Sequence, residues 1–161
     1  MKALTWKQPF ASLMLHGKIE TRTWKANVRG TVLICASKVP YNLNQVLDIS
    51  GDYQLTRIMN TLALPDPGNF GDLNCGYAIA MGDLIDCRPM KPTDEDDCFV
   101  QYNPDLWCHI YEDVRAIIPI PFKGKQGWSE VYDDILHQIQ YSDQELAAKI
   151  VLNKLCKEKF I

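Results

Sequence analysis

The chain has 161 residues, of which 47% are hydrophobic and 23% are charged. This length and composition fit one globular domain with a core of its own and exclude two domains of ordinary size. No apolar run approaches the roughly 20 residues that span a bilayer, and the first ten residues, MKALTWKQPF, lack the apolar stretch of a signal peptide. We therefore expect a cytoplasmic protein that makes no contact with a membrane.

The formal net charge of −3 conceals an uneven distribution of charge along the chain. Residues 1–40 carry seven Lys or Arg and a single acid, Glu20, whereas the rest of the chain carries ten bases and nineteen acids. Acids concentrate in 83–113, around the run Asp94-Glu95-Asp96-Asp97, while 114–128 is again free of acids. Such basic segments can bind an anion locally in a protein that is acidic overall; alternatively, acids and bases pair across the fold and cancel.

Six cysteines are spread over the chain without a C-x-x-C pair. Several of them, such as Cys35 in TVLICAS and Cys156 in VLNKLC, lie in apolar runs, where a reduced cysteine packs as a small hydrophobic residue. The nearest approach to the spacing of zinc ligands is the adjacent pair Cys108-His109. We expect free, structural thiols, no metal site and no cofactor.

The first forty residues predict three strands and a short helix. Residues 2–6 predict a strand, and Pro9 then suits the first turn of a helix that ends at Gly17 after about two turns. Side chains in 19–24 alternate with the period of a strand, and the β-branched run 31–36 is typical of a buried strand. Because the helix is so short, packing rather than propensity must stabilise it.

The middle of the chain predicts one helix and one long strand. Residues 42–62 have helical periodicity with a break at Ser50-Gly51, and the prolines and glycines of 64–76 indicate a loop. The run 77–90 predicts a long strand, in which Gly82 marks a bulge or a close approach of another chain segment.

The last third predicts two more strands and a final helix. Residues 91–106 form an acidic excursion, within which the run 94–97 is expected to be a solvated loop. Strands follow at 107–111 and 114–120, where two prolines force an exit from the sheet. A capping box begins a C-terminal helix at Ser142. These elements indicate an α+β fold. We expect a small mixed β-barrel with peripheral helices, although the periodicity alone does not select a barrel.

The segment HGKIETRTWKANVRG (16–30) holds the strongest functional signal, because it places one carboxylate among four cations. On a strand, Glu20, Arg22 and Trp24 point to the same side, and Lys18 falls on the same parity. Such a group would hold a polar, planar ligand: the arginine donates, the carboxylate accepts and the indole stacks. The alternative is an ordinary salt bridge that completes a solvated surface.

The sequence around this segment resembles the ASCH family, whose mark is a Gly-x-Lys-x-x-Glu-x-Arg motif after a short helix. The resemblance is carried by TWKQPFASLMLHGKIETRTW, by Arg29-Gly30 before TVLICAS, and by the later strands in GYAIAMGDLIDC and WCHIYEDVRAIIPIPFKGKQGW. It covers scattered blocks of 1–131 and implies a PUA-like barrel, leaving 132–161 as a helical extension packed on it. It also implies a cleft beside the motif strand that takes RNA, another single-stranded nucleic acid or a nucleotide-like molecule.

Some small members of the family are amidohydrolases that remove the acyl group from N4-acetylcytidine with a lysine and a threonine of the motif. In this chain Glu20 and Arg22 match the motif, the spacing from Gly17 is shorter, and the match of Lys18 stays open. We therefore keep a hydrolase, either an amidohydrolase or a nuclease, as the alternative to a binding protein. Lys18, Glu20 and Thr21 would then carry the chemistry.

Further ligand contacts are expected outside the motif strand. The loop Lys123-Gly124-Lys125-Gln126-Gly127-Trp128 combines two cations, flexible glycines and an aromatic ring, so it could contact phosphates and stack on a base. The predicted ligand-binding set is Lys18, Glu20, Arg22, Trp24, Arg29, Ser37, Lys38, Lys123, Lys125 and Trp128. The acidic run at 94–97 is a further candidate, as a contact for a protein partner.

Overall fold

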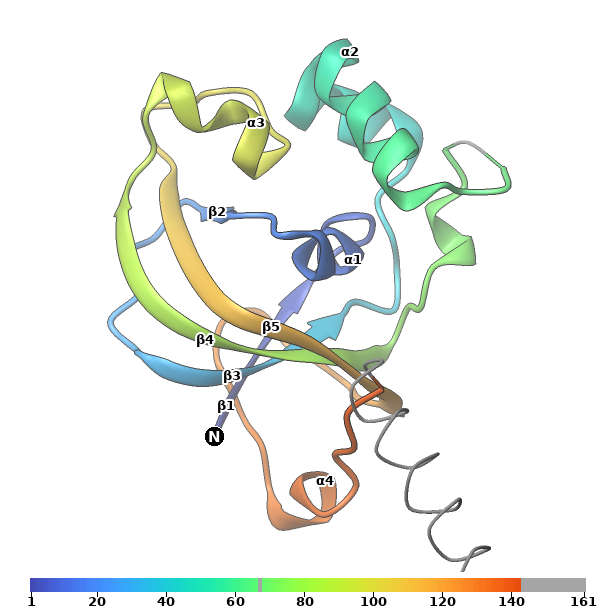
Figure 1. Ribbon diagram of the computed structural model, residues 1–161, viewed down its shortest axis with the longest axis vertical. Coiled ribbons are helices and arrows are strands. Elements are labelled where there is room, and N and C mark those ends of the chain that lie inside the picture. The colour runs from blue at the N-terminus through green and yellow to red at the C-terminus, as the bar shows by residue number, and fades with distance from the viewer. Residues whose placement is uncertain (67, 143–161) are drawn as a thin grey trace, which may run out of the picture.

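The computed structural model describes residues 1–66 and 68–142, and its main feature is one mixed six-stranded sheet. The sheet has the order β2-β5-β4-β3-β1-β6, in which β1 and β3 are parallel and the other neighbours antiparallel. It curls into a half-barrel around α1 (Figure 1). The strands are β1 (Lys2–Trp6), β2 (Glu20–Arg22), β3 (Gly30–Ala36), β4 (Tyr77–Pro89), β5 (Trp107–Pro121) and β6 (Ser129–Glu130).

The curl of the sheet comes from bulges between its two longest strands. The register of β4 against β5 shifts three times, and each such irregularity bends a strand and increases its twist. Gly82 lies at one shift, where an added Cβ would come within 2.9 Å of Val114 Cγ2, so the close approach predicted there is confirmed. The prediction of two separate strands at 107–111 and 114–120 was wrong: β5 is continuous, and Asp113 absorbs the irregularity at a φ of +50°.

The helices lie at the open side and the ends of the half-barrel. They are α1 (Phe10–Leu13), η1 (Met14–His16), α2 (Leu43–Leu62), η2 (Phe70–Asp72), η3 (Pro92–Asp94), α3 (Glu95–Cys98) and α4 (Asp133–Leu136), where η marks a 3-10 turn. Gly17 ends η1 in the left-handed region, as predicted. The predicted break in α2 is also confirmed, because Gly51 has non-helical backbone angles (φ 77°, ψ 170°).

The acidic run 94–97 lies in η3 and α3, so the prediction of a loop was wrong, although Asp96 and Asp97 are exposed to solvent as predicted. Asp94 is buried and accepts two hydrogen bonds from Arg88, of 2.7 and 2.9 Å. It also accepts a hydrogen bond from the Lys91 backbone N–H. The hydrogen bonds from Arg88 are the main cause that holds the pKa of the Asp94 carboxyl well below its ordinary value, and the bond from Lys91 adds to them. Asp97 contributes its backbone carbonyl, which accepts the Ile19 N–H at 2.9 Å. The run therefore anchors the segment that leads into β2.

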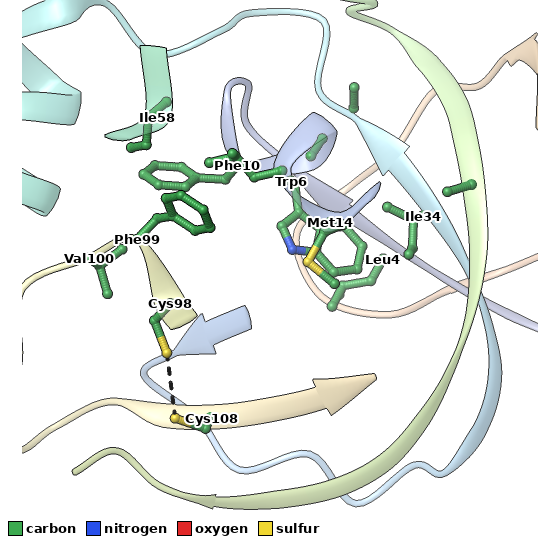
Figure 2. Close-up of a cluster of buried hydrophobic side chains, with 14 of the residues drawn as sticks. Leu4, Trp6, Phe10, Met14, Ile34, Ile58, Cys98, Phe99, Val100 and Cys108 are labelled. Atoms are coloured by element: carbon green, nitrogen blue, oxygen red, sulfur yellow. Dashed lines mark hydrogen bonds between the residues drawn. The ribbon is translucent and has the colours of Figure 1, made fainter. Parts of the chain in front are cut away.

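The main hydrophobic core fills the concave side of the sheet and continues under α2 (Figure 2). Leu4 and Trp6 of β1 pack near Met14, while Phe10 lies beside Phe99 and Ile58 of the helical layer. Burying a large apolar side chain contributes about 1.5–3 kcal/mol, so this packing is what stabilises the short α1. The cysteines in the described residues are all free, and all but Cys75 are buried.

The secondary structure of the described C-terminal residues differs from the predicted one. β6 and α4 were not predicted, and the helix predicted to begin at Ser142 falls in 143–161, outside the described residues. None of the helices in 1–66 and 68–142 combines the length and the apolar character needed to cross a bilayer.

Candidate ligand-binding site

A cavity of about 690 Å³ opens beside β2, and we call it the motif cavity. Its walls come from the end of β1, from α1, from the motif segment 18–24 and from the loop 124–127. Its volume falls within the range of roughly 300–1,000 Å³ that is typical of small-ligand sites. The residues that line it include Thr5, Trp6, Lys7, Phe10, Lys18, Glu20, Thr21, Arg22, Trp24, Ser37, Tyr41, Gly124 and Lys125.

Glu20 is the centre of a nearly buried ion-paired group. Glu20 is 5% exposed and Lys18 is 3% exposed, and Lys18 Nζ lies 3.1 Å from Glu20 Oε1. Arg22 Nη2 lies 3.3 Å from the other carboxylate oxygen, and the Thr21 backbone N–H donates to Oε1 at 2.8 Å. The sequence thus brings the acid and both cations together in a hollow, which excludes the alternative of a surface salt bridge open to bulk water.

The ionised form of Glu20 is favoured despite its burial. Burial by itself would raise the pKa of the carboxyl, but the charges of Lys18 and Arg22 and the Thr21 N–H outweigh it, so the pKa lies below its usual value. Lys18 Nζ also donates to the Ile19 carbonyl at 3.0 Å and lies 5.3 Å from the centroid of the Phe10 ring. Each cation is therefore fixed in position by Glu20 and by a second contact.

Arg22 lies between two indole rings with part of its guanidinium group free. Its Cζ is 5.1 Å from the Trp6 centroid and 5.9 Å from the Trp24 centroid, both within the range of a cation–π contact. Its Nη2 donates to Glu20 and, at 2.9 Å, to the Thr5 carbonyl. The N–H groups on Nη1 and Nε have no partner within 1–66 and 68–142, so they remain available to a ligand.

Trp24 is positioned from behind by a buried histidine. The Trp24 carbonyl lies 2.9 Å from His109 Nε2, and because a carbonyl only accepts, His109 carries its proton on that nitrogen. Burial lowers the pKa of His109 and so favours the neutral ring. The Trp24 ring makes T-shaped contacts with the rings of His109 and Trp128, at centroid distances of 4.9 and 5.9 Å. Trp24 lies beyond the end of β2 but still lines the motif cavity.

The cavity brings together six members of the ligand-binding set predicted from the sequence. Those that line it are Lys18, Glu20, Arg22, Trp24, Ser37 and Lys125, together with Thr21 of the hydrolase alternative. Arg29, Lys38, Lys123 and Trp128 are not among its lining residues. Arg29 instead donates to the Ala26 and Val28 carbonyls, and Trp128 makes a T-shaped contact with Trp24.

Four residues that line the cavity were not among the predicted ligand contacts. They are Trp6, Lys7, Phe10 and Tyr41. Tyr41 arrives through tertiary structure, since its backbone N–H donates to the Gln8 carbonyl at 2.9 Å. With Lys7 included, four cations and one carboxylate line the cavity, which favours an anionic ligand.

The loop 124–127 closes the cavity because Gly124 lies directly on β1. A Cβ at this position would be 2.0 Å from Thr5 Oγ1 and 3.0 Å from Thr5 Cβ. We expect Gly124→Ala to lower the free energy of unfolding by about 1–3 kcal/mol through overpacking, measured by urea denaturation. Thr5→Ala in the same chain should restore part of the loss, with the single Thr5→Ala variant as the control. A Gly124→Ala protein as stable as the wild type would contradict this contact.

No protein-family model matches this chain, and no curated protein matches it. The chemistry of the motif cavity is therefore the basis for the function proposed below.

Proposed function

We propose that this protein binds a nucleotide unit of RNA, or of another single-stranded nucleic acid, in the motif cavity. The observation that carries the proposal is Arg22, held by Glu20 between two indole rings with N–H groups left over for a ligand. A cation fixed beside aromatic faces suits a molecule that has both a phosphate and a planar base. The excess of cations around the cavity supports the same class of ligand.

Each part of the group has a role in this proposal. An ionised carboxylate offers about four lone-pair positions, and Lys18, Thr21 and Arg22 occupy three of those on Glu20. The remaining position, on Oε2, would accept a hydrogen bond from the exocyclic amine of a base. Arg22 and the exposed Lys125 would bind phosphate, and Trp24 would stack on the base.

The fold supports the family expectation at a coarse level. The curled, mixed six-stranded sheet with few helices is compatible with a small barrel such as the PUA-like fold that the ASCH resemblance implies. We also propose that the fold is a PUA-like barrel and that the chain belongs to the ASCH family.

The hydrolase alternative has less support from the geometry. Lys18 Nζ donates to Glu20 Oε1 at 3.1 Å and to the Ile19 carbonyl at 3.0 Å, so protein oxygens already engage the amine that would have to attack an acyl carbon. Glu20 is likewise occupied by three donors. Incubation with N4-acetylcytidine, followed by chromatography of the nucleosides, separates the two functions: release of cytidine would favour the enzyme.

The test of the proposal is the salt dependence of RNA binding. Lys7, Arg22 and Lys125 line the cavity and could each neutralise a phosphate, so log K should fall against log salt with a slope of roughly −2, at about 0.7 per phosphate of a single strand. Fluorescence anisotropy with a short random-sequence single-stranded RNA pool gives this slope. Absence of binding, or an affinity that does not depend on salt concentration, would overturn the proposal.

Trp24 should contribute a stacking term that does not depend on salt. Removal of an aromatic ring from a stacked base costs about 1–3 kcal/mol, so we expect Trp24→Leu to weaken RNA binding by about 5- to 150-fold at every salt concentration. Trp107→Leu is the matched control, because Trp107 is half-buried and is not among the residues that line the motif cavity. Equal losses in the two variants would indicate a general effect on folding instead of stacking.

A further inference from the structure

A second cavity, of about 560 Å³, adjoins the first, and we call it the adjoining cavity. It lies between the segment 39–45 and the segment 68–71, and two of its residues, Lys7 and Tyr41, also line the motif cavity. The two hollows therefore meet at these side chains. Each volume alone falls in the range of a small-ligand site.

The lining of the adjoining cavity has the chemistry of a nucleotide subsite. It contains one cation, three amide side chains and two aromatic rings, and none of its lining residues is acidic. Asn42 and Gln45 use their amide oxygens in the capping box of α2, while their NH₂ groups have no partner in the part of the chain that the structure describes. These donors suit phosphate or base oxygens, and the half-buried Tyr41 ring with the exposed Val39 and Leu43 side chains suits a base or a sugar.

The residues shared by the two cavities are placed where a linking phosphate would pass. Lys7 Nζ lies 5.3 Å from the Tyr41 ring centroid, so the cation sits over the ring at the common wall. Tyr41 is held there by its backbone bond to Gln8 and by edge contact with Phe10, at a centroid distance of 5.9 Å. Lys7 is exposed and belongs to no ion pair in the described residues, so its charge is available to a ligand.

We infer that the ligand is an oligonucleotide of at least two linked nucleotides. One unit occupies the motif cavity, the next occupies the adjoining cavity, and the phosphate between them lies at Lys7. This inference depends on the proposed function, since it names the length of the ligand that the motif cavity takes.

The experiment compares ligands of one and two nucleotides on the full chain. Dissociation constants are measured by isothermal titration calorimetry for a mixture of the four nucleoside monophosphates and for a random dinucleotide RNA pool. We expect the dinucleotides to bind at least tenfold more tightly. If the monophosphates bind equally well, the inference is overturned while the proposed function stands; if neither ligand binds, both are overturned.

Charge changes at Asn69 test which cavity holds the second unit. Asn69 is exposed, lines only the adjoining cavity, and its side chain makes no cap bond to η2. We expect Asn69→Asp to weaken dinucleotide binding about fivefold and Asn69→Lys to strengthen it by a similar factor, with monophosphate binding unchanged. Asn60→Asp is the matched control, on the exposed surface of α2 away from both cavities. If the affinity for dinucleotides does not change with the charge at position 69, or changes equally in Asn60→Asp, the inference is overturned.

Discussion

Glu20→Gln is expected to lower the free energy of unfolding by about 3–5 kcal/mol, the usual cost of removing one partner of a buried ion pair. The side chain of Lys18 is 1% exposed, and Glu20 is the carboxylate that compensates its charge. The amide has the same shape as the carboxylate but no charge, so the ammonium group would remain buried without a counter-ion. For a chain of this size each kcal/mol corresponds to about 2–4 °C in Tm, which makes the loss easy to measure by urea or thermal unfolding.

Two controls separate the effect of the charge from other effects of the substitution. Glu130→Gln removes the acid from an exposed Lys–Glu pair with Lys2, where solvent screens the interaction, and should change stability little. Lys18→Met combined with Glu20→Gln removes both charges and should recover much of the loss. Equal stability of Glu20→Gln and Glu130→Gln would contradict the burial of the ion pair.

The same ion pair predicts how stability depends on pH. The pKa of Glu20 is lower in the folded chain than in the unfolded chain, so its contribution is present above the ordinary glutamate value, about 4.3, and is lost as pH falls through the folded pKa. The stability difference between the wild type and Glu20→Gln should therefore be largest near neutral pH and narrow in acid. A difference independent of pH between 7 and 3 would contradict the assignment.

Local patterns in the sequence were sufficient to predict most of the sheet and the core of the site. Glu20 and Arg22 share a parity on β2, and a strand fixes that relation without information from elsewhere in the fold, while Lys18 lies two residues before Glu20 and pairs with it. The break in α2 and the bulge at Gly82 followed in the same way, from a glycine inside a regular pattern.

What could not be predicted depends on tertiary contacts. The sequence of the acidic run is typical of a solvated loop. Its structure depends on the ion pair between Asp94 and Arg88 of β4, which no pattern within 91–106 predicts. Arg29 and Trp128 have the residue types of a ligand contact, but Arg29 donates to backbone carbonyls and Trp128 packs against Trp24. Tyr41 enters the site because the chain crosses the end of β1 after β3, where it meets Lys7, the residue that follows β1.

Arg22→Gln is expected to weaken RNA binding at least 30-fold, which corresponds to about 2 kcal/mol, the lower end of the cost of truncating a charged group in a binding interface. The variant removes the charge and the planar fork while glutamine still fills part of the space between Trp6 and Trp24. Because one phosphate contact is lost, the salt slope should also become shallower by about 0.7. Arg22→Lys keeps the charge without the fork and should fall between the wild type and Arg22→Gln.

Arg29→Gln is the matched control for this prediction. Arg29 is an exposed arginine of the same basic segment, it donates to backbone carbonyls, and it is not among the residues that line the motif cavity. A ligand attracted only by the general positive charge of residues 1–40 would respond equally to the loss of either arginine, in affinity and in salt slope. A ligand bound in the motif cavity responds to Arg22 alone, because that guanidinium group is the one that Glu20 and the Thr5 carbonyl hold at the cavity. Equal effects of the two variants would therefore argue against binding in the motif cavity, even if RNA binding itself were observed.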